Sequence, residues 1–392
     1  MFYHNIMPFL FIITHLVSSQ SAPLAPALYV FGDSLLDNGN NNMLPTLAKA
    51  NYHPYSIKFS AHVPLGRFKD GRTIADFIAE FLGLPYPPPY VHLFGSNWII
   101  QSDTTLSSNL FRASLITGYN YASAACGILP ETGSLYVRNT PRDYIILGKC
   151  ISMDEQIEMF EGTIKSQLAP IYNDHGQLYQ YLSKSIFLII TGNNDYIQNY
   201  LNPLILPSKQ YDPDQFAQLL VDTFSLQIKR LYELGARKII LSDIGPLGCT
   251  PFFTRSLRRM LNNSEICECD ENVNLIVSKF NDRLATMLQN LTASLIDSHF
   301  ILQRSYHRSY DLIKHPAKYA YAISASRHLG ELPVGVATDI KVGPYHSNGT
   351  TKAPMNGCVG VTSVKFNACE DMGPPHKSKA EFPVSIPGEK RN

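Results

Sequence analysis

The chain has 392 residues, which is enough for one large domain or two small ones. Its formal net charge is +1 at pH 7, so charge gives no indication of nucleic acid or an anionic membrane as a partner. Apolar residues make up 45% of the chain, which is ordinary for a globular protein and argues against a disordered or fibrous one.

The N-terminus carries an apolar run from Ile6 to Val17. The run is shorter than the ~20 residues that a membrane-spanning helix needs, and Ser19 and Ser21 follow it as in a small-x-small cleavage site. We therefore interpret residues 1–21 as a secretory signal peptide; a buried N-terminal strand or helix is the alternative. No later segment reaches ~18 apolar residues, so we expect a secreted, extracellular protein without stable membrane insertion.

Apolar runs alternate with helical patterns along the chain, which predicts βα units and a parallel sheet. Ser152 with Glu155 has the pattern of a capping box, and Asp212 before Pro213 is typical of a helix start. The periodicity fades after about Tyr319, so low order is expected in the tail at 320–392. The patterns predict strands over 27–31, 184–190 and 238–241, helices over 73–82, from 152, over 212–235 and over 272–295, and an extended proline-rich loop over 86–90.

Seven cysteines are present, and in an oxidising compartment some of them should pair. The odd number leaves at least one free or intermolecular, and Cys267 and Cys269 are too close in sequence to pair comfortably with each other. The pairing is otherwise open among Cys126, Cys150, Cys249, Cys267, Cys269, Cys358 and Cys369. Candidate glycosylation sequons occur at Asn262, Asn290 and Asn348.

The first candidate site segment is Gly32-Asp33-Ser34, directly after the first predicted strand. The carboxyl edge of a parallel sheet is where open α/β folds build their sites. A serine hydroxyl there becomes a good nucleophile once a base takes its proton. An ordinary turn or helix cap is the structural alternative for this segment.

Two further segments place small and polar residues together. Gly192 to Asp195 follows the second predicted strand, where an asparagine amide can donate to a developing oxyanion; an Asx turn is the alternative. Gly118 to Gly127 is rich in small residues, which let backbone N–H groups approach a ligand; a tightly packed loop is the alternative. Neither segment is a glycine-rich phosphate loop and no metal-type spacing occurs, so no cofactor is expected.

In this order the segments resemble the blocks of the GDSL esterase/lipase family, also called SGNH hydrolases, and its plant branch in particular. The first block matches the family's pattern at Asp37, Gly39 and Asn40 as well as at Ser34. The resemblance covers residues 27 to 319, and its other blocks are 66–77, 122–129, 193–195, 244–251 and 310–313.

The resemblance implies an α/β fold, a three-layer αβα sandwich with a central parallel sheet of flavodoxin-like type, over a hydrolase domain at 22–319. It implies that Ser34 is the nucleophile and that the oxyanion hole is formed by the Ser34 N–H, the Ala125 N–H and Asn194. Ala125 stands where many members have glycine. It also implies a late Asp-x-x-His pair whose histidine is the base, and a small-molecule ester or lipid as substrate.

The Asp-x-x-His-Pro block is not found, so the aspartate and histidine of the charge relay stay unassigned. None of the late pairs has the required spacing, and His328 has no acid at the right distance. Either the tail at 320–392 replaces the family's C-terminus, which we favour, or a divergent tail supplies a base from new positions. Loss of the family's final helix would expose one face of the sheet. The pairs considered are Asp311 with His315, Asp339 with His346, and Asp371 with His376.

These features predict an enzyme that hydrolyses carboxylic esters of lipid-like or acylated compounds through a serine acyl-enzyme. Without a histidine, general-base activation of Ser34 is lost, and only the residual catalysis of the oxyanion hole and binding is left. Two alternatives remain open at this point. One is transfer of the acyl group to an alcohol, and the other is a catalytically impaired protein that binds acylated ligands.

Overall fold

The computed structural model describes residues 22–59, 65–94, 116–133, 136–138, 144–146, 148–172, 174–202, 210–260, 268–316 and 318–319. The predicted signal peptide and the tail at 320–392 lie outside these residues. The strands are β1 (Leu28–Gly32), β2 (Tyr136–Arg138), β3 (Tyr144–Ile146), β4 (Ile186–Ile190), β5 (Lys238–Ser242) and β6 (His299–Gln303). The main helices are α2 (Ile74–Leu82), α3 (Tyr90–Phe94), α5 (Met153–Thr163), α6 (His175–Lys184), α8 (Pro213–Glu233), α9 (Pro251–Met260), α10 (Glu271–Ser294) and α11 (Ser305–Lys314).

The main sheet has the order β1-β4-β5-β6, and all three strand pairs are parallel. A further segment runs along the free side of β1, because the Leu28 N–H donates to the Thr117 carbonyl and the Tyr121 N–H to the Val30 carbonyl. Val30 and Asn120 form a parallel bridge there. Numbered along the chain, these strands follow the order 2-1-3-4-5 of flavodoxin-like sheets.

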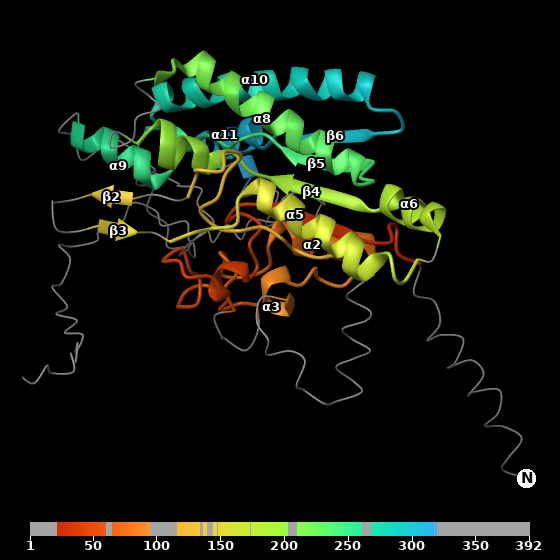
Figure 1. Cartoon of the computed structure of the whole chain (residues 1–392). Helices are drawn as coiled ribbons and strands as arrows, with labels where there is room; N and C mark the ends of the chain where they lie inside the picture. Colours follow the sequence, from red (N-terminus) through yellow and green to blue (C-terminus); the bar gives the residue numbers. More distant parts are fainter. Residues whose placement is uncertain are drawn as a thin grey trace, which may run out of the picture.

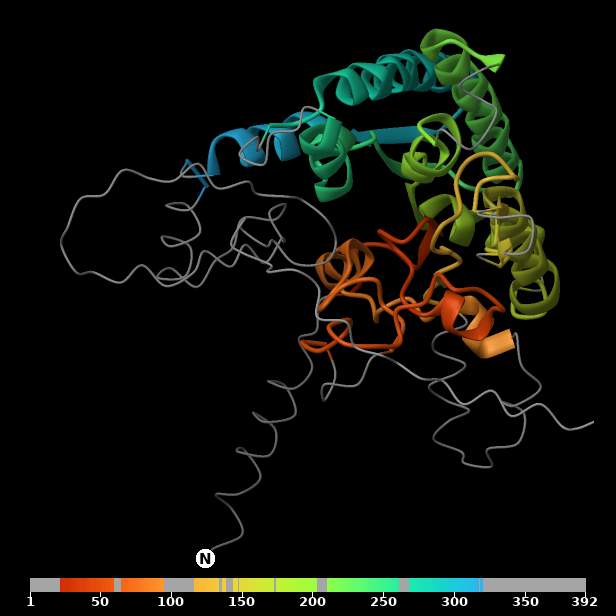
Figure 2. The same cartoon turned by 90° about the vertical axis from the view of Figure 1, so that its left-hand side faces the viewer.

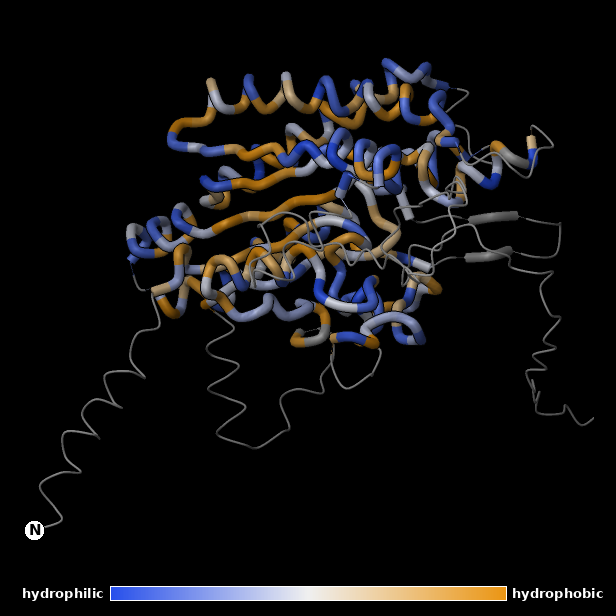
Figure 3. Tube along the Cα trace, turned by 180° about the vertical axis from the view of Figure 1, so that it is seen from behind, coloured by the Kyte–Doolittle hydropathy of each residue, from blue (hydrophilic) through white to orange (hydrophobic). Residues whose placement is uncertain are grey.

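Helices cover both faces of this sheet, as predicted. Alternate residues of a strand point to opposite faces, so Tyr29 and Phe31 join the buried cluster with α5, α8 and α10, whereas Leu28 and Val30 join the cluster with α2. Figure 1 shows α8 and α10 along one side of β5 and β6, and Figure 2 shows the orange segment that contains α2 on the opposite side. Apolar colour runs along the strands between these layers (Figure 3).

The predicted elements agree with the structure to within a few residues. Ser152 and Glu155 form the expected capping box at the start of α5, and Asp212 with Gln215 forms another at the start of α8. Two pieces of the sheet were not predicted: β6, an edge strand that is partly exposed, and the segment beside β1. The latter carries polar Asn120 and Ser123 among its apolar residues, which hides its strand character.

The sheet is less covered at β6 than at β1. Ile240 and Ile301 are partners in the register of β5 and β6 and lie on the face that α2 covers further along the sheet. Ile240 is partly buried there, whereas Ile301 is 61% exposed. The described residues therefore cover one face of β6 better than the other.

Two disulfides join cysteines of the described chain, so the expectation of pairing is confirmed for four of the seven. They are Cys126–Cys150 and Cys249–Cys269. Cys267, Cys358 and Cys369 lie outside the described residues. Among the helices that the structure describes, none has the length and apolar character needed to cross a membrane.

Candidate active site

Ser34 lies just beyond the carboxyl end of β1, and its side chain is half-buried. Gly32 of β1 is the register partner of Ile190 of β4, so the segments that follow these two strands emerge side by side. Gly32 has a φ of 141°, and an added Cβ would lie 2.0 Å from the Ile190 carbonyl oxygen, so only glycine fits there. The site thus lies at the switch point of the sheet, where chain order reverses about β1.

Two backbone N–H groups of this edge are available to a ligand. Within the described part of the chain, neither the Ser34 N–H nor the Ala125 N–H donates to another protein group. Ala125 has a φ of 75°, the left-handed conformation that favours glycine. Ala125 therefore adopts a backbone conformation that glycine adopts more easily. Its N–H is not bonded to any described residue.

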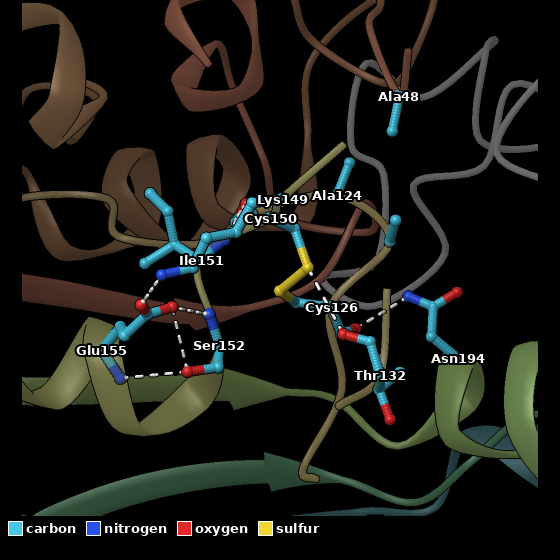
Figure 4. Close-up of a disulfide and its surroundings, with 12 residues drawn as sticks. Ala48, Ala124, Cys126, Thr132, Lys149, Cys150, Ile151, Ser152, Glu155 and Asn194 are labelled. Atoms are coloured by element: carbon cyan, nitrogen blue, oxygen red, sulfur yellow. Dashed lines mark hydrogen bonds and ion pairs between the residues drawn. A yellow bond between two sulfur atoms is a disulfide. The ribbon is translucent and has the colours of Figure 1, made fainter. Parts of the chain in front are cut away.

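The segment Asn193-Asn194-Asp195 connects the loops around Ser34. The Asn193 amide donates to the Asp33 carboxylate over 3.2 Å, and the Asn194 amide donates from Nδ2 to the Cys126 carbonyl over 2.8 Å. Asn194 is 8% exposed, and the side chain points from the start of its helix to the loop of the disulfide (Figure 4). Because the amide nitrogen carries two hydrogens and makes this one donation among the described residues, its second hydrogen remains for a ligand.

Asp195 fixes the loop that carries Ala125. Its buried carboxylate accepts the N–H groups of Ile128 and Leu129 at 2.8 and 3.0 Å and the hydroxyl of Thr132 at 2.7 Å. A Cβ on Gly127 would lie 2.2 Å from Asp195 Oδ2, so the backbone approaches the carboxylate as closely as glycine allows. The role of Asp195 is thus to hold the loop in place.

The first block supports the same loop from the other side. Asp37 accepts the N–H groups of Gly39 and Asn40 through one oxygen and that of Ala124 through the other. Asn40 donates to the carbonyls of Asn120 and Ala122 at 2.9 and 2.8 Å. The block residues Asp37, Gly39 and Asn40 therefore shape the backbone around Ser34 and do not form part of the reacting group.

Three aspartates at this edge are fully buried. Burial raises the pKa of Asp33, Asp37 and Asp195 to about 6, although N–H donors from the neighbouring segments oppose the shift. Asp33 is adjacent to Ser34, and its carboxylate accepts the Leu35 N–H at 2.9 Å. The resulting edge is a buried, hydrogen-bonded frame around a half-buried serine.

A buried ion pair underlies the block at residues 66–77. Arg67 donates to Asp76 over 2.6 Å, and the Thr73 N–H and hydroxyl donate to the same carboxylate oxygen. The Arg67 guanidinium also lies 3.8 Å from the centre of the Phe59 ring. Because the Phe68 N–H donates to the Asp37 carbonyl, this block connects to the Ser34 loop through the backbone.

No base is assigned to Ser34 by the described residues: its hydroxyl has no hydrogen-bond partner among them. One of the late Asp/His pairs can be placed. His315 Nδ1 lies 3.0 Å from Asp311 Oδ1 at the end of α11, where Lys318 and Tyr319 also bind Asp311. The His315 side chain is 66% exposed, and the cluster lies at the end of α11. His328, the pair Asp339 and His346, and the pair Asp371 and His376 lie outside the described residues.

Two glutamines at the site were missed by the sequence reasoning. Gln156 of α5 pairs with both backbone groups of Gly32, accepting its N–H at 2.8 Å and donating to its carbonyl at 2.9 Å. Gln198 donates to the Ala125 carbonyl and to Asn194 Oδ1, each over 3.1 Å. Only the spacing of four between Asn194 and Gln198, one helical turn, could have indicated the second contact.

Known proteins share much of this sequence, including the segments that form the site. The family model for GDSL-like lipase/acylhydrolase matches residues 28–327, which include β1, the Asn193–Asp195 segment and every strand of the main sheet. The chain belongs to this family. It is 42% identical to GDSL esterase/lipase 7 of Arabidopsis thaliana over 308 residues, 78% of this chain and 76% of that protein. It is 38% identical to GDSL esterase/lipase At1g71691 of the same plant over 296 residues, 76% of this chain and 67% of that protein.

Proposed function

We propose that this GDSL-family hydrolase cleaves carboxylic esters of lipid-like or acylated small molecules, with Ser34 as nucleophile. The observation that carries the proposal is the arrangement at the sheet edge. A half-buried serine follows β1, and three N–H donors with no protein acceptor in the described chain come from the segments beside it: the Ser34 N–H, the Ala125 N–H and one hydrogen of Asn194 Nδ2.

In the reaction, Ser34 Oγ attacks the acyl carbon and the carbonyl oxygen becomes an oxyanion. The three N–H donors stabilise this charge, which is larger in the tetrahedral intermediate than in the bound ester. The alcohol leaves with a proton from water, and the acyl group stays on Ser34 until a water molecule hydrolyses it to the acid. Burial of the surrounding aspartates and asparagines keeps the donors aligned before substrate arrives.

The proton of Ser34 passes to solvent in this scheme, since no described histidine contacts the hydroxyl. The rate should then rise with hydroxide concentration, with log(kcat/KM) increasing by about one per pH unit between pH 6 and 9. A plateau above an inflection near the ordinary histidine pKa of ~6.5 would contradict this scheme, because it would reveal a base from outside the described residues.

The proposal is tested with purified protein and short-chain p-nitrophenyl esters. Ser34→Ala should reduce hydrolysis to the level of buffer, whereas a serine outside the site, such as Ser256→Ala on α9, should leave it unchanged. Labelling of Ser34 by a fluorophosphonate probe, located by mass spectrometry, should disappear in Ser34→Ala alone. Equal hydrolysis by wild type and Ser34→Ala would refute Ser34 as the nucleophile.

We further propose that the protein is secreted and glycosylated. The apolar run Ile6–Val17 and the two disulfides support an oxidising, extracellular destination. Asn290 is exposed on α10, while Asn262 and Asn348 lie outside the described residues. Expression in plant cells should give protein in the medium that begins after residue 21, and glycosidase treatment should lower its mass. Retention of residues 1–21 would contradict secretion by this route.

A further inference from the structure

Gln198 makes two hydrogen bonds at the oxyanion side of the site. Its Nε2 donates to the Ala125 carbonyl and to Asn194 Oδ1, each over 3.1 Å. Its Oε1 is buried and has no hydrogen-bond partner in the described chain. Gln198 therefore acts only as a donor, and it connects the two residues that supply the oxyanion donors outside Ser34.

The Asn194 amide is oriented from both of its ends. Nδ2 donates to the Cys126 carbonyl over 2.8 Å, and Oδ1 accepts from Gln198 (Figure 4 shows the first of these contacts). If the amide were reversed, Oδ1 would face the Cys126 carbonyl and Nδ2 would face the donor of Gln198, so both contacts would become repulsive. The observed orientation leaves the second hydrogen of Nδ2 for the oxyanion.

The helix that carries Gln198 is a single π-helical turn, Asp195–Tyr200. Such turns are rare and often occur at functional sites. Asp195 and Asn199 anchor this turn to the loop after Ala125, since Asn199 donates to the Thr132 hydroxyl, which in turn donates to Asp195. These contacts hold the turn in place without Gln198. The hydrogen bonds of Gln198 to Asn194 and Ala125 are therefore not needed to anchor the turn itself.

We propose that Gln198 is a positioning residue of the hydrolase, which holds the Asn194 amide and the Ala125 backbone in the orientation that receives the oxyanion. The inference rests on the proposed function of Ser34 and Asn194. Removal of an oxyanion donor typically costs roughly 100- to 1,000-fold in kcat. Gln198→Leu keeps Asn194 but releases one end of its amide, so a smaller fall, on the order of tenfold, is expected.

A double-mutant cycle on p-nitrophenyl butyrate tests the proposal with Gln198→Leu, Asn194→Ala and the double variant. Gln198→Leu should lower kcat on the order of tenfold and change KM by less than about twofold, because the contact is needed in the transition state. In the Asn194→Ala background its effect should be clearly smaller than in the wild type, because only the contact with the Ala125 carbonyl is then left to lose. Gln218→Leu on α8, a Gln→Leu exchange at an exposed residue, is the matched control and should leave kcat unchanged.

An unchanged kcat in Gln198→Leu, or a loss that adds fully to that of Asn194→Ala, would overturn the proposal. Failure of the proposed function has a different signature: wild type and Ser34→Ala then hydrolyse the ester equally. In that case crystal structures of wild type and Gln198→Leu still decide the role of Gln198. The Asn194 amide should turn away from the Cys126 carbonyl in the variant, and an unmoved amide would refute the inference.

Discussion

Two regions at the carboxyl edge of the sheet are held in place to different extents: the oxyanion side after β1 and β4, and the α11 side after β6. On the oxyanion side, buried hydrogen bonds, several of them to the Asp195 carboxylate, join the segments at 120–132 and 193–199. The Cys126–Cys150 disulfide links the first of these segments to the chain just before α5. On the side of α11, the chain leaves β6 into a helix with one buried residue, Leu312, and its Asp311–His315 pair is exposed. The difference teaches that the described chain holds the segments around Ala125 and Asn194 firmly, whereas it holds the residues that follow β6 largely through exposed contacts.

The largest effect should distinguish the two sides by activity. Asn194→Ala removes a donor to the oxyanion and should lower kcat by roughly 100- to 1,000-fold. His315→Ala should change kcat by less than about twofold, because that side chain belongs to the exposed cluster at the end of α11. Both rates are measured on a p-nitrophenyl ester. A large loss in His315→Ala would break the comparison, since it would identify the missing base.

Removing an aspartate should lower the unfolding free energy much more on the oxyanion side than on the α11 side. Asp195→Ala leaves the Ile128 and Leu129 N–H groups and the Thr132 hydroxyl buried without their acceptor, which should cost about 3 kcal/mol or more of unfolding free energy. Asp311→Ala removes the acceptor of surface contacts, so its loss of unfolding free energy should be much the smaller of the two. Urea unfolding of both variants gives the two values. Equal losses would show that the side of α11 is as tightly built as the oxyanion side.

The two disulfides offer a matched pair of removals. The Cys126–Cys150 and Cys249–Cys269 bonds span similar separations, 24 and 20 residues, so each should contribute about 3 kcal/mol to stability. Cys126 also offers its carbonyl to Asn194 and follows Ala125 directly. Replacing the first pair by alanine should therefore lower kcat as well as stability, whereas replacing the second should lower stability alone. Equal effects on kcat would contradict the assignment of the oxyanion side.

The pH dependence of stability should carry opposite signs on the two sides. Burial raises the pKa of Asp33, Asp37 and Asp195 to about 6, above the ~3.9 of an unfolded chain. Their contribution to stability is fully present below the unfolded pKa and is lost as pH rises through 6. The unfolding free energy should thus fall between pH 4 and 7, by about 1.4 kcal/mol per pH unit for each proton of difference.

The α11 side behaves in the opposite way. Hydrogen bonds from Lys318 and Tyr319 lower the pKa of Asp311 to about 2, so its contribution is present above pH ~4 and is lost only as pH falls through 2. Asp33→Asn should therefore flatten the decline in stability between pH 4 and 7, while Asp311→Asn should leave it unchanged. Urea unfolding at a series of pH values measures both slopes. A decline that survives in Asp33→Asn at full steepness would argue against a raised pKa for Asp33.

The sequence predicted the fold where local pattern and tertiary environment agree. The strands at Leu28–Gly32 and Ile186–Ile190 are continuous apolar runs buried on both faces, and the capping boxes at Ser152 and Asp212 rest on contacts within four residues. β6 was not predicted because an edge strand with one exposed face has no such run. The residues of β6 are assigned to a strand by their pairing with β5, which a local sequence pattern does not contain.

The site residues also fall into a group that the sequence predicted and a group that it did not. Ser34 and Asn194 were predicted because each lies within four residues of the end of a buried strand, and because the resemblance to the family blocks names them. Gln156 and Gln198 were not, because a glutamine acts through a single contact with a distant backbone or side chain, and no local pattern marks it. The disulfide pairing was open for the same physical reason, since it depends on which loops the sheet brings together.

The smallest effect concerns the backbone at Ala125. A left-handed conformation costs an alanine about 1–2 kcal/mol relative to the right-handed one, and glycine is free of this strain but loses more conformational entropy on folding. Ala125→Gly should therefore raise the unfolding free energy by at most about 1 kcal/mol. The variant keeps its N–H and its carbonyl bond from Gln198, so kcat should stay the same or rise slightly as the methyl group is removed.

Urea unfolding and ester hydrolysis measure the two quantities on the same preparation, with Ala79→Gly in α2 as the control. Ala79 is buried in a helix, so glycine there should cost about 1 kcal/mol or more. The two exchanges should differ in sign because Ala125 has a positive φ, whereas Ala79 is a buried residue of a right-handed helix. If Ala125→Gly destabilised the protein as Ala79→Gly does, the oxyanion loop would not hold Ala125 in the left-handed conformation, and its N–H would have to be directed towards the substrate by another arrangement.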